Sequence, residues 1–227
     1  MIRVKGINLN LKGKRLLSDI NFRLFPGELC VLFGKNGIGK TSFISALSNI
    51  DGSELKKQID SNPNQIKKWW KKNKSIVFVG FQHPIEIPGV IYIHYLRLVS
   101  KRNNKDKTLL NKLQELDKLL DVKKNMLYRP MNIGFSGGEK RMFELFQMII
   151  IEPNICLLDE PDSGLDDIKT IIIARIILGF NISNRTYLIV THNPRLLLQL
   201  SPDSVYYLID NRIISFRKKL YISDWNK

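Results

Sequence analysis

The chain has 227 residues, of which 44% are hydrophobic and 25% are charged, and these are ordinary proportions for a soluble globular protein of one large domain. The closest approach to a membrane-spanning segment is residues 171–180, which are too few and are interrupted by Arg175. The first residues alternate like a strand and lack the apolar core of a signal peptide. We therefore expect a soluble protein of the cytoplasm, or of an organelle stroma if it is plastid-encoded.

The formal net charge of +15 raises the question of a nucleic-acid partner. The lysines are scattered, however, and the one cluster that places aromatic side chains among them is residues 67–72, Lys-Lys-Trp-Trp-Lys-Lys. Lys, Ile and Asn are abundant together, which is what the codon bias of an AT-rich genome produces. We favour this explanation of the charge over nucleic-acid binding.

The pattern of apolar residues predicts strands and helices along the whole chain. Residues 2–9 and 16–24 alternate between apolar and polar side chains around Lys12-Gly13-Lys14, which predicts an antiparallel hairpin. Residues 51–73 are polar and predict a surface excursion. The other predicted elements are a buried strand at 29–33, a helix from near Ser42, a short helix at 65–72, a strand at 75–79, two helices within 91–122, a helix after Gly138, a strand at 155–158, a helix at 168–180, a strand at 187–190, and a terminal hairpin of 204–209 and 212–215.

A phosphate-binding loop follows the predicted strand at 29–33. Residues 34–41 fit the pattern G-x-x-x-x-G-K-T, in the strand–loop–helix setting that this motif requires. Its glycines let backbone N–H groups curl around a β-phosphate, Lys40 reaches the β- and γ-phosphate oxygens, and the Thr41 hydroxyl ligates Mg²⁺. The loop therefore predicts binding of a nucleoside triphosphate.

The segment of residues 135–166 carries further groups that hydrolysis requires. Ser136-Gly137-Gly138 precedes a helix and presents backbone N–H groups at its positive end, where phosphate oxygens bind well. Residues 155–158 predict a buried strand that ends in Asp159 and Glu160. One carboxylate can hold Mg²⁺, and its neighbour can accept a proton from an attacking water.

In this order the pieces resemble the signature motif, Walker B strand, catalytic glutamate and D-loop of the ATP-binding-cassette (ABC) ATPases, with the D-loop at residues 162–166. The resemblance implies an α/β P-loop NTPase fold in a single domain of residues 1–227. Such a domain has a mixed β-sheet core, an antiparallel β subdomain and an inserted α-helical subdomain, here at about residues 83–135. It also implies ATP as substrate and a transient ATP-dependent homodimer. Two copies would enclose two ATP molecules, with each phosphate loop facing residues 136–139 of the other copy.

The patterns together give a set of expected site residues. Gln82, at the tip of the strand predicted at 75–79, can reach both Mg²⁺ and the attacking water. By the resemblance, His192 occupies the H-loop position that contacts the γ-phosphate, and Leu11 stands where many ABC ATPases stack an aromatic ring on adenine, so we expect loose base discrimination. The expected catalytic residues are Gln82, Glu160 and His192; the expected Mg²⁺ ligands are Thr41, Gln82 and Asp159; and the expected ATP contacts are Gly34, Asn36, Gly37, Gly39, Lys40, Thr41, Ser42, Ser136, Gly137, Gly138, Glu139 and Asp166.

A narrower resemblance covers about residues 4–214. Residues 81–90, Phe-Gln-His-Pro-Ile-Glu-Ile-Pro-Gly-Val, look like the Q-loop of the SufC family, the ABC ATPases of the SUF system of iron–sulfur cluster assembly. Residues 132–141, 145–148, 152–153, 162–166 and 190–192 resemble the same family. The resemblance implies that ATP-driven dimerisation bends a SufB/SufD scaffold on which the cluster is built. Cys30 and Cys156 lie in apolar runs, which predicts buried thiols rather than cluster ligands or a disulfide.

Two other functions stay open. One is the ATPase subunit of a membrane transporter, which would bind a membrane permease without itself inserting into the membrane. The other is a nucleic-acid-associated ABC ATPase, whose activity would rise with DNA or RNA. Transport ATPases usually carry Gln at the position of Glu139 and lack the run Glu-Ile-Pro-Gly-Val at residues 86–90, so the sequence favours the SufC-type function.

Overall fold

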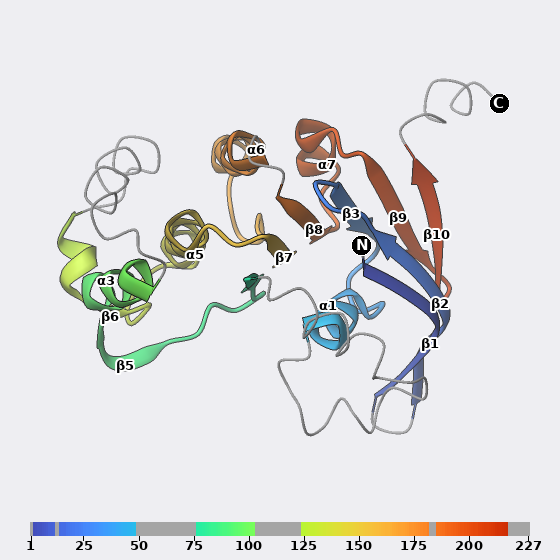
Figure 1. Cartoon of the computed structure of the whole chain (residues 1–227), viewed down its shortest axis with the longest axis horizontal. Helices are drawn as coiled ribbons and strands as arrows, with labels where there is room; N and C mark the ends of the chain where they lie inside the picture. The colour runs from blue at the N-terminus through green and yellow to red at the C-terminus, as the bar shows by residue number, and fades with distance from the viewer. Residues whose placement is uncertain (1, 12–13, 49–75, 103–123, 182–184, 218–227) are drawn as a thin grey trace.

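The computed structural model describes residues 2–11, 14–48, 76–102, 124–181 and 185–217. At its centre is a six-stranded sheet with the strand order β10-β9-β3-β8-β7-β4 (Figure 1). Strands β9, β3, β8, β7 and β4 are parallel and β10 is antiparallel to β9, so the sheet is mixed. The strands are β3 (Leu29–Phe33), β4 (Val77–Gly80), β7 (Ile155–Asp159), β8 (Thr186–Thr191), β9 (Ser204–Ile209) and β10 (Arg212–Arg217).

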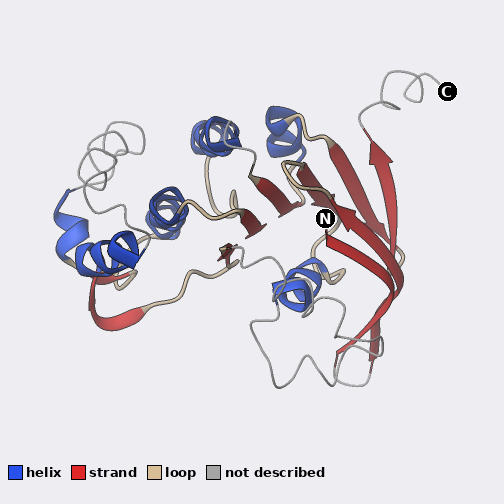
Figure 2. Cartoon of the chain, in the orientation of Figure 1, coloured by secondary structure: helices blue, strands red, loops and turns tan. Residues whose placement is uncertain are grey.

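The central strands are buried on both faces because apolar layers cover each side of the sheet (Figure 2). In β3, Leu29 and Val31 join the core formed with helices α5 (Gly137–Ile151), α6 (Asp167–Asn181) and α7 (Pro194–Leu200). Cys30 and Leu32 join the second core, which contains helix α1 (Lys40–Ser48) and the hairpin of β1 and β2. Continuous apolar runs are what doubly covered parallel strands require, so the pattern that predicted β3, β7 and β8 follows from this layering.

The predicted N-terminal hairpin is confirmed, with β1 (Ile2–Leu11) antiparallel to β2 (Lys14–Leu24). Hydrogen bonds with Tyr206 and Asn211 join it to the far end of the chain. The Tyr206 hydroxyl donates to the Arg23 carbonyl at 2.9 Å, and the Ser18 N–H donates to the Asn211 carbonyl at 3.0 Å. The hairpin is therefore held against the edge of the central sheet formed by β9 and β10.

A second part of the molecule extends from the β4 edge of the sheet (Figure 1). Tyr92 anchors it, because its buried hydroxyl donates to the Phe143 carbonyl of α5 at 2.5 Å and its ring packs edge-on against the Phe143 ring. Its elements are β5 (Ile87–Ile91), α3 (Tyr92–Arg102), the 3-10 helix η2 (Lys124–Tyr128) and β6 (Pro130–Met131).

Several element boundaries differ from the prediction. Helix α1 begins at Lys40, inside the phosphate loop rather than near Ser42, and β4 covers Val77–Gly80 rather than residues 75–79. Four elements were not predicted, namely β5, η2, β6 and α7. Strands β5 and β6 are short, and β5 contains Pro88 and Gly89, which are rare inside strands. Helix α7 begins with an Asn193 cap followed by Pro194, a typical helix start that the prediction overlooked.

The short helix predicted at 65–72 lies outside the described residues. The part of the predicted helix pair beyond α3 lies outside them as well. Cys30 and Cys156 are buried and unpaired with each other, as expected. Among the described residues, the structure contains no helix with the length and apolar character needed to cross a membrane.

Candidate functional site

The loop between β3 and α1 requires glycine at two positions. Gly37 and Gly39 have φ angles of 77° and 108°, values that side chains other than glycine rarely adopt. A Cβ atom on Gly39 would also lie 2.9 Å from the Leu16 side chain of β2. These two glycines thus let the loop turn tightly beneath the N-terminal hairpin and then enter α1.

Lys40 is held inside this loop. Its side chain is only 4% exposed, and its Nζ donates to the carbonyls of Gly34 and Lys35, each at 2.8 Å. The same Nζ lies 3.5 Å from Asn36 Oδ1 and 3.6 Å from Glu160 Oε1. A buried ammonium group is costly unless it is paired. Here the two carbonyls and Glu160 hold the Lys40 ammonium group in place, so the loop offers a fixed positive charge to an anionic ligand.

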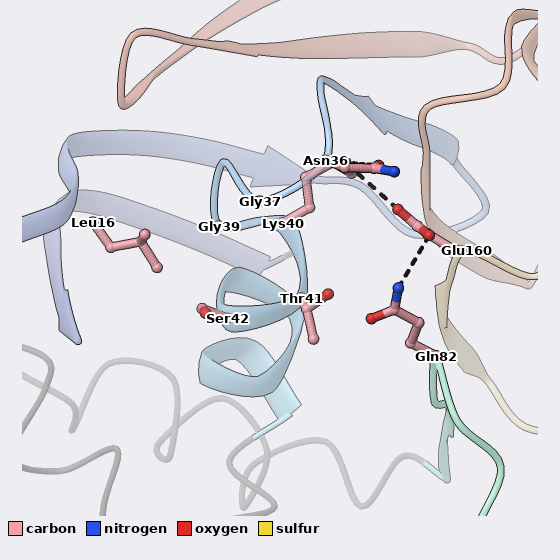
Figure 3. A pocket seen from close by; sticks show the side chains of 9 residues that line it. All are labelled: Leu16, Asn36, Gly37, Gly39, Lys40, Thr41, Ser42, Gln82 and Glu160. Carbon is pink, nitrogen blue, oxygen red and sulfur yellow. Dashed lines mark hydrogen bonds and ion pairs between the residues drawn. The ribbon is translucent and has the colours of Figure 1, made fainter. Parts of the chain in front are cut away.

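A pocket of ≈ 270 Å³ opens in front of Lys40 (Figure 3). It lies over the loop and the first turn of α1, and Gln82 and Glu160 reach it from the ends of β4 and β7. Leu16 of β2 was not predicted as a site residue, and it supplies an apolar surface beside the loop. The side chain of Leu11, predicted to contact adenine, lies outside the described residues. The lining residues are Leu16, Asn36, Gly37, Gly39, Lys40, Thr41, Ser42, Gln82 and Glu160.

Glu160 is the point where the predicted catalytic residues meet. Its Oε2 accepts a hydrogen bond from Gln82 Nε2 at 3.2 Å, and its Oε1 lies 3.1 Å from His192 Nδ1. Glu160 itself is 5% exposed, with a φ of 47°, and its N–H is bonded to the Val190 carbonyl at 2.9 Å. A buried carboxylate held in a strained backbone conformation at a strand end is a typical feature of functional sites. It can accept a proton from a water in the pocket.

Asp159 has the properties expected of a metal ligand. The residue is 3% exposed, and its Oδ1 has no hydrogen-bond partner within the described part of the chain. Burial raises the pKa of this carboxyl group, while the nearby Thr41 hydroxyl acts in the opposite direction. The described residues contain no group of three or more His, Cys, Asp or Glu able to hold a metal alone. Mg²⁺ is commonly bound by one or two protein oxygens together with phosphate oxygens, which this arrangement can provide.

The signature residues do not line the pocket of their own chain. Ser136 caps α5: its Oγ accepts the Glu139 N–H at 3.2 Å, and Glu139 Oε2 accepts the Ser136 N–H at 2.8 Å. Ser136 and Gly137 are exposed, and a Cβ atom on Gly137 would meet no described atom within 4 Å. This positive helix end is therefore open to a ligand on another molecule.

Asp166 is also placed away from the pocket. It is exposed, and its Oδ1 accepts the Lys169 N–H at 2.8 Å at the start of α6. This backbone N–H, followed by the charge of Lys169, lowers the pKa of the Asp166 carboxyl group. Within the chain Asp166 caps a helix, and its predicted contact with ATP would require a second copy.

Two buried charged residues near the site were missed from the sequence. Arg141 and Glu144 of α5 are 3% and 7% exposed, and Arg141 Nη1 lies 2.9 Å from Glu144 Oε2. In the sequence they look like part of a polar stripe at the start of an amphipathic helix. The signal that could have found them is their position on a helix where Met142, Phe143, Leu145 and Phe146 between and after them are all buried and apolar.

Glu144 makes the stability of the fold depend on pH. Burial raises its pKa from 4.5 to about 7, although Arg141 and the Phe81 N–H act in the opposite direction. Because the folded state binds this proton more tightly than the unfolded state, the resulting stabilisation is complete below pH 4.5 and is lost as the pH rises through 7. We expect the free energy of unfolding of the wild type, relative to Glu144→Gln, to fall by on the order of 1 kcal/mol per pH unit in this window. Urea titrations of both proteins measure this, and a constant difference would contradict it.

Comparisons with known proteins agree with this geometry. Residues 17–163 match the family described as ABC transporter. The chain is 30% identical to the "Probable ATP-dependent transporter SufC" of Escherichia coli (strain K12), over 94% of this chain and 91% of the relative. It is 33% identical to the "Probable ATP-dependent transporter ycf16" of Trieres chinensis, over 94% and 90%. A probable ABC transporter ATP-binding protein of Streptococcus pyogenes serotype M18 is 29% identical, over 94% and 87%.

Solved structures show the same fold. The ATP-binding subunit of an ABC transporter superposes with a TM-score of 0.79 at 19% identity, over 99% of this chain and 92% of that chain. The dimeric structure of MJ0796, a bacterial ABC transporter cassette, gives a TM-score of 0.74 at 19% identity, over 96% and 98%. The predicted ABC-type α/β fold and the resemblance to SufC are thereby confirmed. The chain belongs to the ABC transporter family and is an ABC-type ATPase that binds ATP.

Proposed function

We propose that the chain hydrolyses ATP to drive a conformational change in a SufB/SufD-type scaffold on which an iron–sulfur cluster is assembled. The observation that carries this proposal is the 30% identity to SufC over 94% of the chain. The Q-loop segment, residues 81–90, resembles the same family. The cluster would lie on the scaffold. In keeping with this, Cys30 and Cys156 are buried, and burial raises the pKa of the Cys156 thiol to about 12, which makes it a poor metal ligand.

For hydrolysis we propose that Glu160 is the general base, with Gln82 and His192 beside it as catalytic residues. Lys40 and the backbone N–H groups of residues 34–41 would bind the β- and γ-phosphates, and Ser42 and Asn36 would complete the pocket. Thr41, Asp159 and Gln82 would hold Mg²⁺, which when bound neutralises the charge that develops on the phosphates. Glu160 would take the proton of the attacking water. Its contacts with Gln82 and His192 would orient the carboxylate for this step.

We further propose a transient homodimer in the presence of ATP. The pocket holds the phosphate loop and the base, whereas Ser136, Gly137, Gly138 and Glu139 lie at an exposed helix start of the same chain. A second copy can supply this positive helix end to the γ-phosphate, and its Asp166 to the dimer interface. The active site would then consist of residues from two chains.

The Q-loop segment is the proposed contact with the scaffold. Ile85 is 56% exposed, whereas Ile87 packs against the core and pairs with Met131 of β6. Ile85 is therefore the residue better able to contact a partner, whereas Ile87 serves packing within the chain. An exposed isoleucine beside the catalytic residues is well placed to transmit the state of the nucleotide.

The change Ile85→Asp is expected to lower recovery of a co-expressed SufB–SufD scaffold by at least about tenfold, because burying a carboxylate at an apolar contact is unfavourable. Recovery is measured by affinity purification of the tagged chain. Leu198→Asp on α7 is the matched control, since Leu198 is also exposed, at 77%, but lies away from the Q-loop segment. Undiminished recovery with Ile85→Asp would remove this residue from the docking surface.

The second candidate is the ATPase subunit of a membrane transporter. Its support is the similarity of 29% to ABC transporter ATP-binding proteins of Streptococcus pyogenes over 94% of the chain. The same affinity purification, done from detergent-solubilised cells, separates the two functions. Recovery of a membrane permease in place of a soluble scaffold would favour the transporter.

A further inference from the structure

We propose that Arg141 and Glu144 are positioning residues for Gln82: together they hold the backbone of Phe81 and Gln82, so that the Gln82 side chain reaches Glu160. The inference rests on the role proposed above for Gln82, but not on the identity of any partner. It concerns residues of this chain that neither the motifs nor the comparisons assign.

The two side chains form a clamp around the peptide groups that follow β4. Arg141 donates from Nη1 to the Phe81 carbonyl and from Nη2 to the Gln82 carbonyl. Glu144 Oε1 accepts the Phe81 N–H at 2.8 Å, while its Oε2 is bonded to Arg141 Nη1 at 2.9 Å. Every hydrogen bond of this clamp is therefore directed at one bend of the chain or at the other member of the pair.

The clamp is needed because the sheet ends just before it. Strand β4 ends at Gly80, and its last register partner is Leu158 of β7. A Cβ atom on Gly80 would lie 3.0 Å from the Leu158 side chain and 3.4 Å from the Glu144 carboxyl group, so α5 approaches this backbone closely. Beyond Gly80, the Phe81 N–H and the carbonyls of Phe81 and Gln82 are bonded to side chains of α5 instead of to a neighbouring strand.

Stability alone gives no reason for a charged pair at this place. Replacing a buried ion pair by well-packed apolar residues is often neutral or stabilising, since both charges must be removed from water. Arg141 and Glu144 lie among the apolar core residues of α5, where apolar side chains would fit the pattern. A planar guanidinium group, by contrast, can hold two carbonyls and a carboxylate in one fixed geometry.

The clamp also connects the two halves of the proposed active site. Helix α5 begins at the signature residues and carries Arg141 and Glu144, so Gln82 is fixed to the helix that presents Ser136. Two further contacts extend the connection along the Q-loop segment: Lys140 Nζ lies 2.5 Å from Glu86 Oε1, and Asn132 Nδ2 donates to the Ile85 carbonyl at 2.7 Å. A shift of α5 would therefore move Gln82 relative to Glu160.

The test is the double variant Arg141→Met/Glu144→Leu, which removes both charges but keeps apolar volume. We expect kcat to fall about 10- to 100-fold through misplacement of Gln82, with the KM for ATP changed less than about twofold. In a Gln82→Ala background the same two changes should lower kcat no further, because the residue on which they act is already gone. A readout independent of turnover is the amide hydrogen exchange of Phe81 without nucleotide, which should accelerate at least about tenfold.

The control is Glu152→Gln, which removes the ion pair between Arg185 and Glu152, the C-cap residue at the opposite end of α5. It should leave kcat and the exchange of Phe81 unchanged. Should the double variant fail to fold, Arg141→Lys gives the same test, since a lysine cannot hold both carbonyls and the carboxylate in one plane.

Unchanged kcat and unchanged exchange of Phe81 in the variant would overturn the proposal. A further loss of kcat in the Gln82→Ala background would also overturn it, because the pair would then act by another route. If Gln82→Ala itself leaves kcat unchanged, the role proposed for Gln82 is wrong, and the exchange of Phe81 still decides whether the pair holds this backbone.

Discussion

Glu160→Gln is expected to lower the rate of ATP hydrolysis by about 10²–10⁴-fold while ATP still binds. The amide has nearly the shape of the carboxylate, so the contacts with Gln82 and His192 can largely be kept. What it lacks is the ability to accept a proton from water. Because the phosphate loop and Lys40 are unchanged, the affinity for ATP is expected to remain close to that of the wild type.

Steady-state release of phosphate measures the turnover, and equilibrium binding of a fluorescent ATP analogue measures the affinity. Glu152→Gln is a suitable control, since it makes the same chemical change in a carboxylate outside the site. Turnover at the wild-type rate in Glu160→Gln would show that another group, or no protein group, accepts the proton. Loss of ATP binding instead would assign Glu160 a role in binding. The 3.6 Å contact between Glu160 and Lys40 would then explain this role, because Lys40 would be misplaced in the variant.

Much of the site could be predicted from the sequence because its geometry is local. The shape of the phosphate loop depends on the φ angles of Gly37 and Gly39, and the start of α5 depends on a capping box between Ser136 and Glu139. Asp159 and Glu160 follow from the rule that a buried parallel strand presents its ligands at its C-terminal end. Each of these features is specified by residues within a few positions of one another.

The features that were missed are specified over long distances. Glu144 accepts the Phe81 N–H across 63 positions of sequence, and no spacing rule links a helix interior to the end of a strand so far away. Leu16 lines the pocket because the N-terminal hairpin folds over the loop, which depends on β2 contacting residues at the end of the chain. Strand β5 was missed for a different reason. It contains Pro88 and Gly89, which argue against a strand in the sequence, and it is a strand because the tertiary structure pairs it with β6.

Mixing two inactive variants, Lys40→Ala and Ser136→Arg, is expected to restore activity. Each variant alone should lose at least about 10²-fold in turnover, the first because a phosphate-binding charge is removed and the second because a bulky side chain blocks the exposed helix start. In a mixed dimer, one site combines the intact phosphate loop of one chain with the intact signature residues of the other. At equal amounts about half of the dimers are mixed and each has one such site, so the mixture should reach about a quarter of wild-type activity.

The structure makes this expectation specific, because Ser136 lines no part of the pocket in its own chain and yet is exposed at the start of α5. Ser136→Arg also removes a helix cap, which costs about 1 kcal/mol, so Ser136→Asp is the matched variant: it keeps a good cap but places a negative charge against the phosphate. It should be inactive alone and be rescued by Lys40→Ala in the same way.

For the wild type, specific activity should rise with enzyme concentration. Activity independent of concentration, without rescue in either mixture, would mean that one chain forms the whole active site, and the signature residues would then need a different function.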